Sequence, residues 1–171
     1  AMAVRLQPVT AARLTRFFHA TVVPRSRPPA SLVLTQGVAM FHERRSHRAP
    51  VLLVEDDVDA AVALGAALQC AGYPMRWART GEEGLELLSL ERRRSVVLLD
   101  LMLPDMTGVQ FAQRLPGYHL RPPLILISGS SPQVLNDAAA ELRPMATLRK
   151  PFELSDLLGW VEAAWREVKA G

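Results

Sequence analysis

Short apolar runs alternate with longer amphipathic segments along most of the chain. Val51–Val54, Val96–Leu99 and Leu124–Ile127 are wholly apolar, and an acidic residue or a serine follows each of them. Uninterrupted apolar runs of this length are typical of strands buried on both faces, as in a parallel sheet. Two weaker runs, Pro74–Ala78 and Ala146–Arg149, predict two further short strands.

The segments between these runs carry helical spacing and helical end signals. Leu64 and Leu68 lie one turn apart, and Gly72 follows as a stop signal. Thr80 followed by Glu83 predicts a capping box at the start of the second helix. The other predicted helices are Ala60–Ala71, Thr107–Leu115, Pro132–Leu142 and Glu153–Lys169.

Five strands that alternate with five helices predict an α/β fold. Right-handed crossovers then give a doubly wound five-stranded parallel sheet with helices on both faces. On the last helix one broad apolar face should pack on the sheet: Leu154, Leu157, Leu158, Val161, Ala164, Trp165 and Val168. Trp160 lies at the edge of this face, so it is either a partly buried rim residue or part of an exposed apolar patch.

The first part of the chain differs from the rest in charge. Residues 1–49 hold eight arginines and one acid, for a net charge of +7, whereas residues 50–171 hold twelve basic and sixteen acidic residues, for a net charge of −4. We interpret 1–49 as a basic Pro/Arg-rich extension, with a short helix at Thr10–Ala20, and 50–171 as one domain. The extension suits nucleic acid, an acidic membrane surface or the acidic domain itself.

Three further interpretations of the extension stay open. Arginine is the usual cation of this chain, so an Arg-rich stretch need not mark a binding site. An Arg-rich amphipathic start also resembles an organelle-targeting peptide. Alternatively, Met40 is the natural start and the preceding residues are upstream sequence.

Composition narrows the class of protein. No stretch approaches the roughly 18 consecutive apolar residues that span a bilayer, so we expect no membrane span. The single cysteine, Cys70, has no internal partner for a disulfide, which suits a reducing, cytoplasmic location. We expect the Cys70 side chain to be a small buried hydrophobe.

Polar residues follow the predicted strands at the point where each strand ends. They are the acidic triplet 55–57, Asp100, Ser128 and Lys150. In an open α/β sheet, ligands bind outside the carboxyl ends of the strands, so these side chains should meet at one edge. Clustered carboxylates attract Mg²⁺, and a carboxylate can attack phosphorus while a hydroxyl and an ammonium contact the phosphoryl oxygens.

Four stretches resemble the signature blocks of bacterial response-regulator receiver domains, in the same order. They are Val51-Leu-Leu-Val-Glu-Asp-Asp57, Asp100-Leu-Met-Leu-Pro-Asp-Met-Thr-Gly108, Leu124-Ile-Leu-Ile-Ser-Gly129 and Lys150-Pro-Phe152. The resemblance implies a flavodoxin-like receiver fold in a two-component signalling system. It implies a phosphoacceptor that takes part in its own phosphorylation and slow dephosphorylation, and not an enzyme in the usual sense.

The resemblance assigns the phosphoryl chemistry to three residues. Asp100 would accept phosphate from a histidine kinase or a phosphotransfer protein. Lys150 would pair with the phosphoryl group, and Ser128 would move to bond it on activation. Pro151 would follow a cis peptide bond.

The resemblance also implies a Mg²⁺ site. Asp56 and Asp100 would ligate the ion by their side chains, Met102 by its backbone carbonyl and Glu55 through water. Asp56 belongs to the acidic pair because it precedes Asp100 by 44 residues, as the spacing of the family suggests. Asp57 would then open the following helix.

The output of the domain is less defined. Thr147 replaces the aromatic residue that receivers often use to relay activation. The chain ends at Gly171, so we expect a stand-alone receiver with no direct DNA binding, which signals to an unknown protein target or dimerises through its last helix. The alternatives are an interaction module that works without phosphorylation, or a phosphatase or other phosphotransferase on a similar fold. Haloacid-type hydrolases carry a second Asp where Met102 stands.

Overall fold

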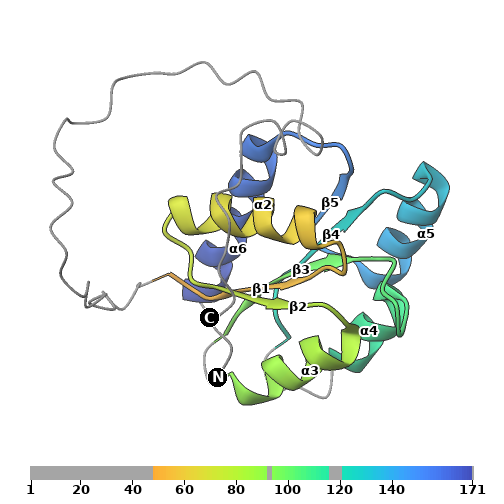
Figure 1. The fold of residues 1–171 in the computed structure, drawn as a ribbon, viewed down its shortest axis with the longest axis horizontal. Helices are drawn as coiled ribbons and strands as arrows, with labels where there is room; N and C mark the ends of the chain where they lie inside the picture. Colours follow the sequence, from red (N-terminus) through yellow and green to blue (C-terminus); the bar gives the residue numbers. More distant parts are fainter. Residues whose placement is uncertain (1–47, 92–93, 116–120, 171) are drawn as a thin grey trace, which may run out of the picture.

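The computed structural model describes residues 48–91, 94–115 and 121–170. In these ranges five strands alternate with five helices (Figure 1). The strands are β1 Val51–Val54, β2 Met75–Ala78, β3 Val96–Asp100, β4 Leu124–Ser128 and β5 Ala146–Arg149. The helices are α2 Val58–Cys70, α3 Gly81–Leu90, α4 Gly108–Arg114, α5 Pro132–Leu142 and α6 Leu154–Ala170. The predicted elements are therefore confirmed, with shifts of one or two residues at several ends.

All five strands form one parallel sheet in the order β2-β1-β3-β4-β5. The chain first moves from β1 to β2 on one side, and then crosses β1 to reach β3 on the other side. Strand order therefore reverses between β1 and β3, which is where doubly wound folds bind their ligands. This is the predicted flavodoxin-like arrangement.

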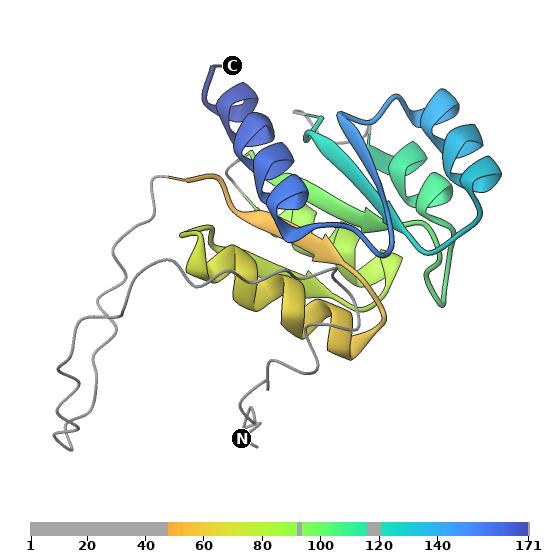
Figure 2. The ribbon, with the colours of Figure 1, turned by 90° about the horizontal axis from the view of Figure 1, so that it is seen from above.

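Helices cover both faces of the sheet, so alternate residues of one strand enter different cores. Val51 and Leu53 join a core with α2 and α6, whereas Leu52 and Val54 join a core with α3, α4 and α5. Figure 1 shows α2 and α6 on one side of the sheet and α3 and α4 on the other, and Figure 2 looks onto the sheet with α2 and α6 in front of the strands. Burial on both faces accounts for the uninterrupted apolar runs in the sequence. The apolar face predicted for the last helix is confirmed, because its residues pack in the first core.

The helix ends bear out two predictions. The Asp57 side chain accepts hydrogen bonds from the backbone N–H groups of Asp59 and Ala60, so it caps α2 as predicted. Gly72 has φ of +82°, a left-handed conformation that L side chains rarely adopt and that commonly ends a helix.

Two predictions about helix ends and burial were wrong. The Thr80 side chain does accept from the N–H of Glu83, but the Glu83 carboxylate accepts from the N–H of Arg79 and not from that of Thr80. The predicted capping box is thus only half formed, because the Glu83 side chain reaches one residue further back. Cys70 is exposed, since it ends α2 on the face turned away from the sheet.

Arg48 joins the beginning of the described chain to α6. Its guanidinium lies 4.4 Å from the ring centre of Tyr73 and 5.3 Å from that of Trp165. It donates a hydrogen bond to Glu162 at 2.8 Å, and the Tyr73 hydroxyl donates to the same carboxylate oxygen at 2.6 Å. These contacts combine cation–π attraction with an ion pair, so the packed body includes Arg48 and the buried Ala49.

The remainder of the predicted extension, including the helix proposed for Thr10–Ala20, lies outside the described residues. Among the helices of residues 48–91, 94–115 and 121–170, none has the length and apolar character needed to cross a bilayer.

Candidate functional site

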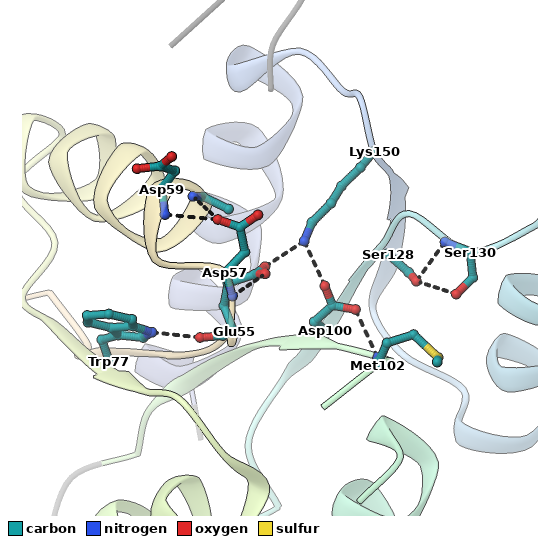
Figure 3. A network of polar contacts seen from close by, with 10 residues as sticks. Glu55, Asp57, Asp59, Trp77, Asp100, Met102, Ser128, Ser130 and Lys150 are labelled. Atoms are coloured by element: carbon teal, nitrogen blue, oxygen red, sulfur yellow. Dashed lines mark hydrogen bonds and ion pairs between the residues drawn. The ribbon is translucent and has the colours of Figure 1, made fainter. Parts of the chain in front are cut away.

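Three of the predicted polar residues, Glu55, Asp100 and Lys150, meet at the carboxyl edge of the sheet. Lys150 Nζ donates to Glu55 Oε2 at 2.6 Å and to Asp100 Oδ2 at 2.7 Å (Figure 3). The three residues follow β1, end β3 and follow β5, so three strands place them. The peptide bond between Lys150 and Pro151 is cis, as predicted.

Burial makes this cluster electrostatically unusual. The Glu55 side chain is 1% exposed, that of Asp100 8% and that of Lys150 20%. Burial raises the pKa of Glu55, and the neighbouring Lys150 offsets only part of that rise. Burial by itself would lower the pKa of Lys150, but Asp100 and Glu55 together raise it. The lysine therefore stays charged and compensates two buried carboxylates that would otherwise repel each other.

The other two members of the acidic triplet lie differently. Asp56 is exposed, and within the described residues its carboxylate makes no hydrogen bond or ion pair. The Asp57 carboxylate is occupied in capping α2. Of these two neighbours, Asp56 is thus the one whose oxygens are available to a ligand.

A backbone N–H group of the loop after β3 holds the Asp100 side chain. The N–H of Met102 donates to Asp100 Oδ1 at 3.0 Å, so both oxygens of Asp100 have a partner. The N–H of Gly108 donates to the carbonyl of Leu101 at 2.8 Å, and Met102 forms an antiparallel bridge with Thr107. Residues 101–107 are therefore a closed loop that sets the position of the Met102 backbone.

Ser128 ends β4 beside this cluster but does not touch its charged groups. Its side chain is fully buried, and its Oγ donates to Ser130 Oγ at 2.9 Å and accepts from the N–H of Ser130 at 3.1 Å. Its carbonyl accepts from the backbone N–H of Lys150 at 2.8 Å. The serine hydroxyl is thus turned toward the β4–α5 loop and away from Asp100 (Figure 3).

The site has an oxygen-rich donor set that fits Mg²⁺. Two carboxylates share one cation, and Mg²⁺ commonly takes one or two carboxylates together with waters and phosphate oxygens. As the side chains stand, no group of three or more His, Cys, Asp or Glu residues in the described ranges is close enough to hold a metal ion. The Lys150 ammonium occupies the position between the carboxylates where a cation is needed.

Sequence reasoning did not predict two contacts that support the site, one made by Trp77 and one by Ser130. Trp77 Nε1 donates to the backbone carbonyl of Glu55 at 2.8 Å, and this bond fixes the end of β1 from the neighbouring strand. Ser130 is the partner of the Ser128 hydroxyl in both of its hydrogen bonds. The contact of Ser130 is local and a Ser-X-Ser pattern could have suggested it, whereas the Trp77 contact depends on strand pairing.

Residues 51–162 match the family model of the response regulator receiver domain. The chain belongs to the response-regulator receiver family. Receivers of two-component signalling are typically phosphoacceptors rather than classical enzymes. They typically use Mg²⁺ and receive the phosphoryl group from a kinase partner. The predicted resemblance is thereby confirmed.

Known receivers resemble this one at moderate identity. It is 33% identical over 112 residues to the response regulator receiver protein CpdR of Brucella abortus, a match that covers 66% of this chain and 92% of CpdR. It is 32% identical over 117 residues to the transcriptional regulatory protein YkoG of Bacillus subtilis, where 68% of this chain matches about half of YkoG, 51% of its length. A CheY-like receiver structure from Methanospirillum hungatei superposes with a TM-score of 0.65 at 24% identity, covering 72% of this chain and 98% of that one. The structural likeness supports the fold.

Proposed function

We propose that this receiver is a phosphoacceptor whose Asp100 takes a phosphoryl group from a histidine kinase or a phosphotransfer protein. The observation that carries the proposal is the shared contact of Lys150 with Glu55 and Asp100 at the carboxyl edge of the sheet. A buried ammonium beside a candidate nucleophile can follow a phosphoryl oxygen as negative charge builds up on it.

The transfer step needs few groups. An oxygen of Asp100 attacks phosphorus, the phosphorus–nitrogen bond to the donor imidazole breaks, and the imidazole nitrogen keeps the bonding electrons and takes a proton. Lys150 leaves the Asp100 carboxylate to pair with a phosphoryl oxygen. Ser128 exchanges its bonds with Ser130 for a bond to the phosphoryl group. Catalysis is then mainly positioning and charge compensation.

We assign the Mg²⁺ ligands to Asp56, Asp100 and the carbonyl of Met102, with Glu55 acting through water. When bound, the ion would neutralise charge on the phosphoryl oxygens. Asp56 is exposed and lies next to the buried cluster, so its carboxylate can turn toward the ion at little cost. Asp57 remains the cap of α2.

Replacing Asp56 with Ala should weaken Mg²⁺ binding by at least tenfold, because it removes a charged ligand. Asp57→Ala is the matched control: it removes the neighbouring carboxylate, costs helix stability through the lost cap, and should leave Mg²⁺ affinity within about twofold. Calorimetric titration with Mg²⁺ measures both affinities. If the two variants exchange behaviour, the assignment of the acidic pair is off by one residue.

We propose that phosphorylation changes partner binding or self-association through the surface where α6, β5 and α5 meet. Trp160 is 42% exposed although it adjoins the packed face of that helix. Exposed aromatic side chains often anchor protein interfaces. The partner is an unknown protein target or a second copy of the chain.

Trp160→Ala should leave phosphorylation of Asp100 unchanged and weaken target binding or self-association by roughly tenfold or more, the loss expected for an aromatic anchor. Sedimentation velocity of the phosphorylated protein measures self-association. Leu90→Ala, at the exposed end of α3 and outside this surface, is the control. If the Trp160 variant associates as well as the unchanged protein, another surface binds the target or the second copy.

For residues 1–49 we propose docking rather than chemistry. The part of this segment that the structure describes, Arg48 and Ala49, packs on the body through Tyr73, Glu162 and Trp165. The contact with Glu162 is between a basic residue of the extension and an acidic residue of the domain, which is the pairing expected from the charge asymmetry of the sequence.

The proposed function is tested by phosphotransfer from a histidine kinase with labelled phosphate. The full chain should gain one acid-stable, base-labile phosphoryl group, and EDTA should prevent the gain. Acetyl phosphate serves as a second donor, so that a mismatched kinase is distinguished from an inert site. Absence of label with both kinds of donor would favour an interaction module that works without phosphorylation.

A further inference from the structure

Asp105 connects the loop after β3 to the start of α3. Its Oδ1 accepts from the N–H of Gly81 at 2.8 Å, and its Oδ2 accepts from the N–H of Glu82 at 2.9 Å. These two N–H groups belong to the first turn of α3 and have no partner within the helix. One exposed carboxylate thus satisfies both groups from a segment more than twenty residues away in sequence.

The same loop and helix also fit together by shape. A Cβ atom added at Gly81 would lie 2.5 Å from Cγ and Sδ of Met106, closer than real Cβ atoms come. Met106 itself packs against the core that α3 and α4 share. The side chains of two successive loop residues therefore meet the first turn of α3, one by hydrogen bonds and the other by contact.

An anchor at Asp105 acts on the whole loop because the loop is closed. The bond from the N–H of Gly108 to the carbonyl of Leu101 and the bridge between Met102 and Thr107 join its two ends. Thr107 also caps α4 in a complete capping box with Gln110. Movement of Asp105 away from α3 would consequently displace the Met102 backbone, which already holds Asp100 through its N–H.

The negative charge of Asp105 favours its contact with the start of α3 at neutral pH. Although burial acts to raise it, the N–H donors of Glu82 and Gly81 hold the pKa of Asp105 below its usual value. The carboxylate is therefore ionised at neutral pH, and it faces the positive end of the α3 dipole.

We propose that Asp105 is a positioning residue for the Mg²⁺ site: by holding loop 101–107 against α3 it fixes the Met102 carbonyl that we assign as a ligand. The inference rests on the proposed function for the identity of the ion and the ligand, and it adds that metal binding at Asp100 is coupled to the start of α3. Binding of Mg²⁺ should in turn tighten the contact between the loop and α3, because such coupling is reciprocal.

The test compares three variants by Mg²⁺ calorimetry and by hydrogen exchange of residues 100–108, without any phosphate donor. Asp105→Ala removes both hydrogen bonds. Asp105→Asn keeps one acceptor and turns an N–H₂ group toward an N–H donor. Arg114→Ala is the matched control, because it removes the exposed ion pair between α4 and Glu82 on the same helix turn and changes a residue outside loop 101–107.

We expect both Asp105 variants to bind Mg²⁺ about tenfold more weakly, the lower end of the range for residues that orient metal ligands. Exchange of residues 100–108 should become faster, while Arg114→Ala should match the unchanged protein in both measurements. Mg²⁺ affinity of Asp105→Ala within twofold of that of Arg114→Ala would overturn the proposal, as would failure of the unchanged protein to bind Mg²⁺. If Mg²⁺ binding depends on Asp105 but Asp100 accepts no phosphate, the proposed function fails and the positioning role stands.

Discussion

Asp100→Asn will abolish phosphorylation of the chain by either a kinase or acetyl phosphate. The amide has no carboxylate oxygen with which to attack phosphorus, and it weakens the attraction that keeps Lys150 at the site. The variant should fold at least as well as the unchanged protein, because it removes one of two buried carboxylates that repel each other; Asp100 itself helps to raise the pKa of Glu55.

Incorporation of labelled phosphate at saturating Mg²⁺ is the measurement, with urea unfolding to establish that the variant is folded. Asp57→Asn is the matched control, because it makes the same change at the acidic residue that caps α2, and it should retain labelling. Equal labelling of the Asp100 variant and the unchanged protein would place the phosphoacceptor elsewhere.

Lys150→Ala will have the largest effect on stability among the site variants. It leaves Glu55 and Asp100 buried without their shared counter-ion, and breaking a buried pair in this way typically costs roughly 3–5 kcal/mol of the free energy of unfolding. The loss should lie at the lower end of that range, because Lys150 is partly exposed and Glu55 can take up a proton. It should also slow phosphorylation strongly.

How the destabilisation by Lys150→Ala depends on pH and on Mg²⁺ distinguishes the loss of a counter-ion from a simple loss of packing. The pKa of Glu55 is raised in the folded state, so the protonated acid stabilises the fold below about pH 4.5, and that contribution is lost as the pH rises through the folded pKa. The destabilisation by Lys150→Ala should therefore grow from acidic to neutral pH. Mg²⁺ should raise the urea midpoint of the variant more than that of the unchanged protein, because the ion replaces the lost charge.

The chain offers one natural control for that experiment. Lys169 is the other lysine, and it lies in the last turn of α6 on the exposed side. Lys169→Ala should change the unfolding midpoint little and should show no extra response to Mg²⁺. If the two lysine variants respond alike to Mg²⁺, the shared contact of Lys150 with the two carboxylates does not hold the site together.

The sequence predicts the elements that depend on local pattern. Apolar runs such as Leu124–Ile127 are distinctive because burial on both faces permits no polar residue. The residues at the strand ends meet because parallel strands present their carboxyl ends at one edge. The resemblance separated Asp57 from Asp56 through the 44-residue spacing between Asp56 and Asp100, which left Asp57 to cap the following helix.

Contacts between distant segments could not be predicted in this way. The anchoring of α3 by Asp105 depends on how the loop after β3 approaches the helix, and no local signal in Pro-Asp-Met marks it. The binding of Arg48 between Tyr73 and Trp165 likewise joins three separate segments. Cys70 was misassigned because its burial depends on the direction in which the last turn of α2 faces, and the weak amphipathic character of that helix does not indicate it.

Arg48 and Asp100 lie at opposite edges of the sheet. Arg48 contacts Tyr73, which precedes β2, and thus lies at the amino edge of the sheet, whereas Asp100 ends β3 at the carboxyl edge. A fluorescent label or a fused domain joined directly to Arg48, in place of residues 1–47, would therefore be attached at the edge of the sheet opposite the phosphoryl site. For a sensor built on this receiver, such a junction keeps the point of attachment away from the edge at which a kinase must approach Asp100.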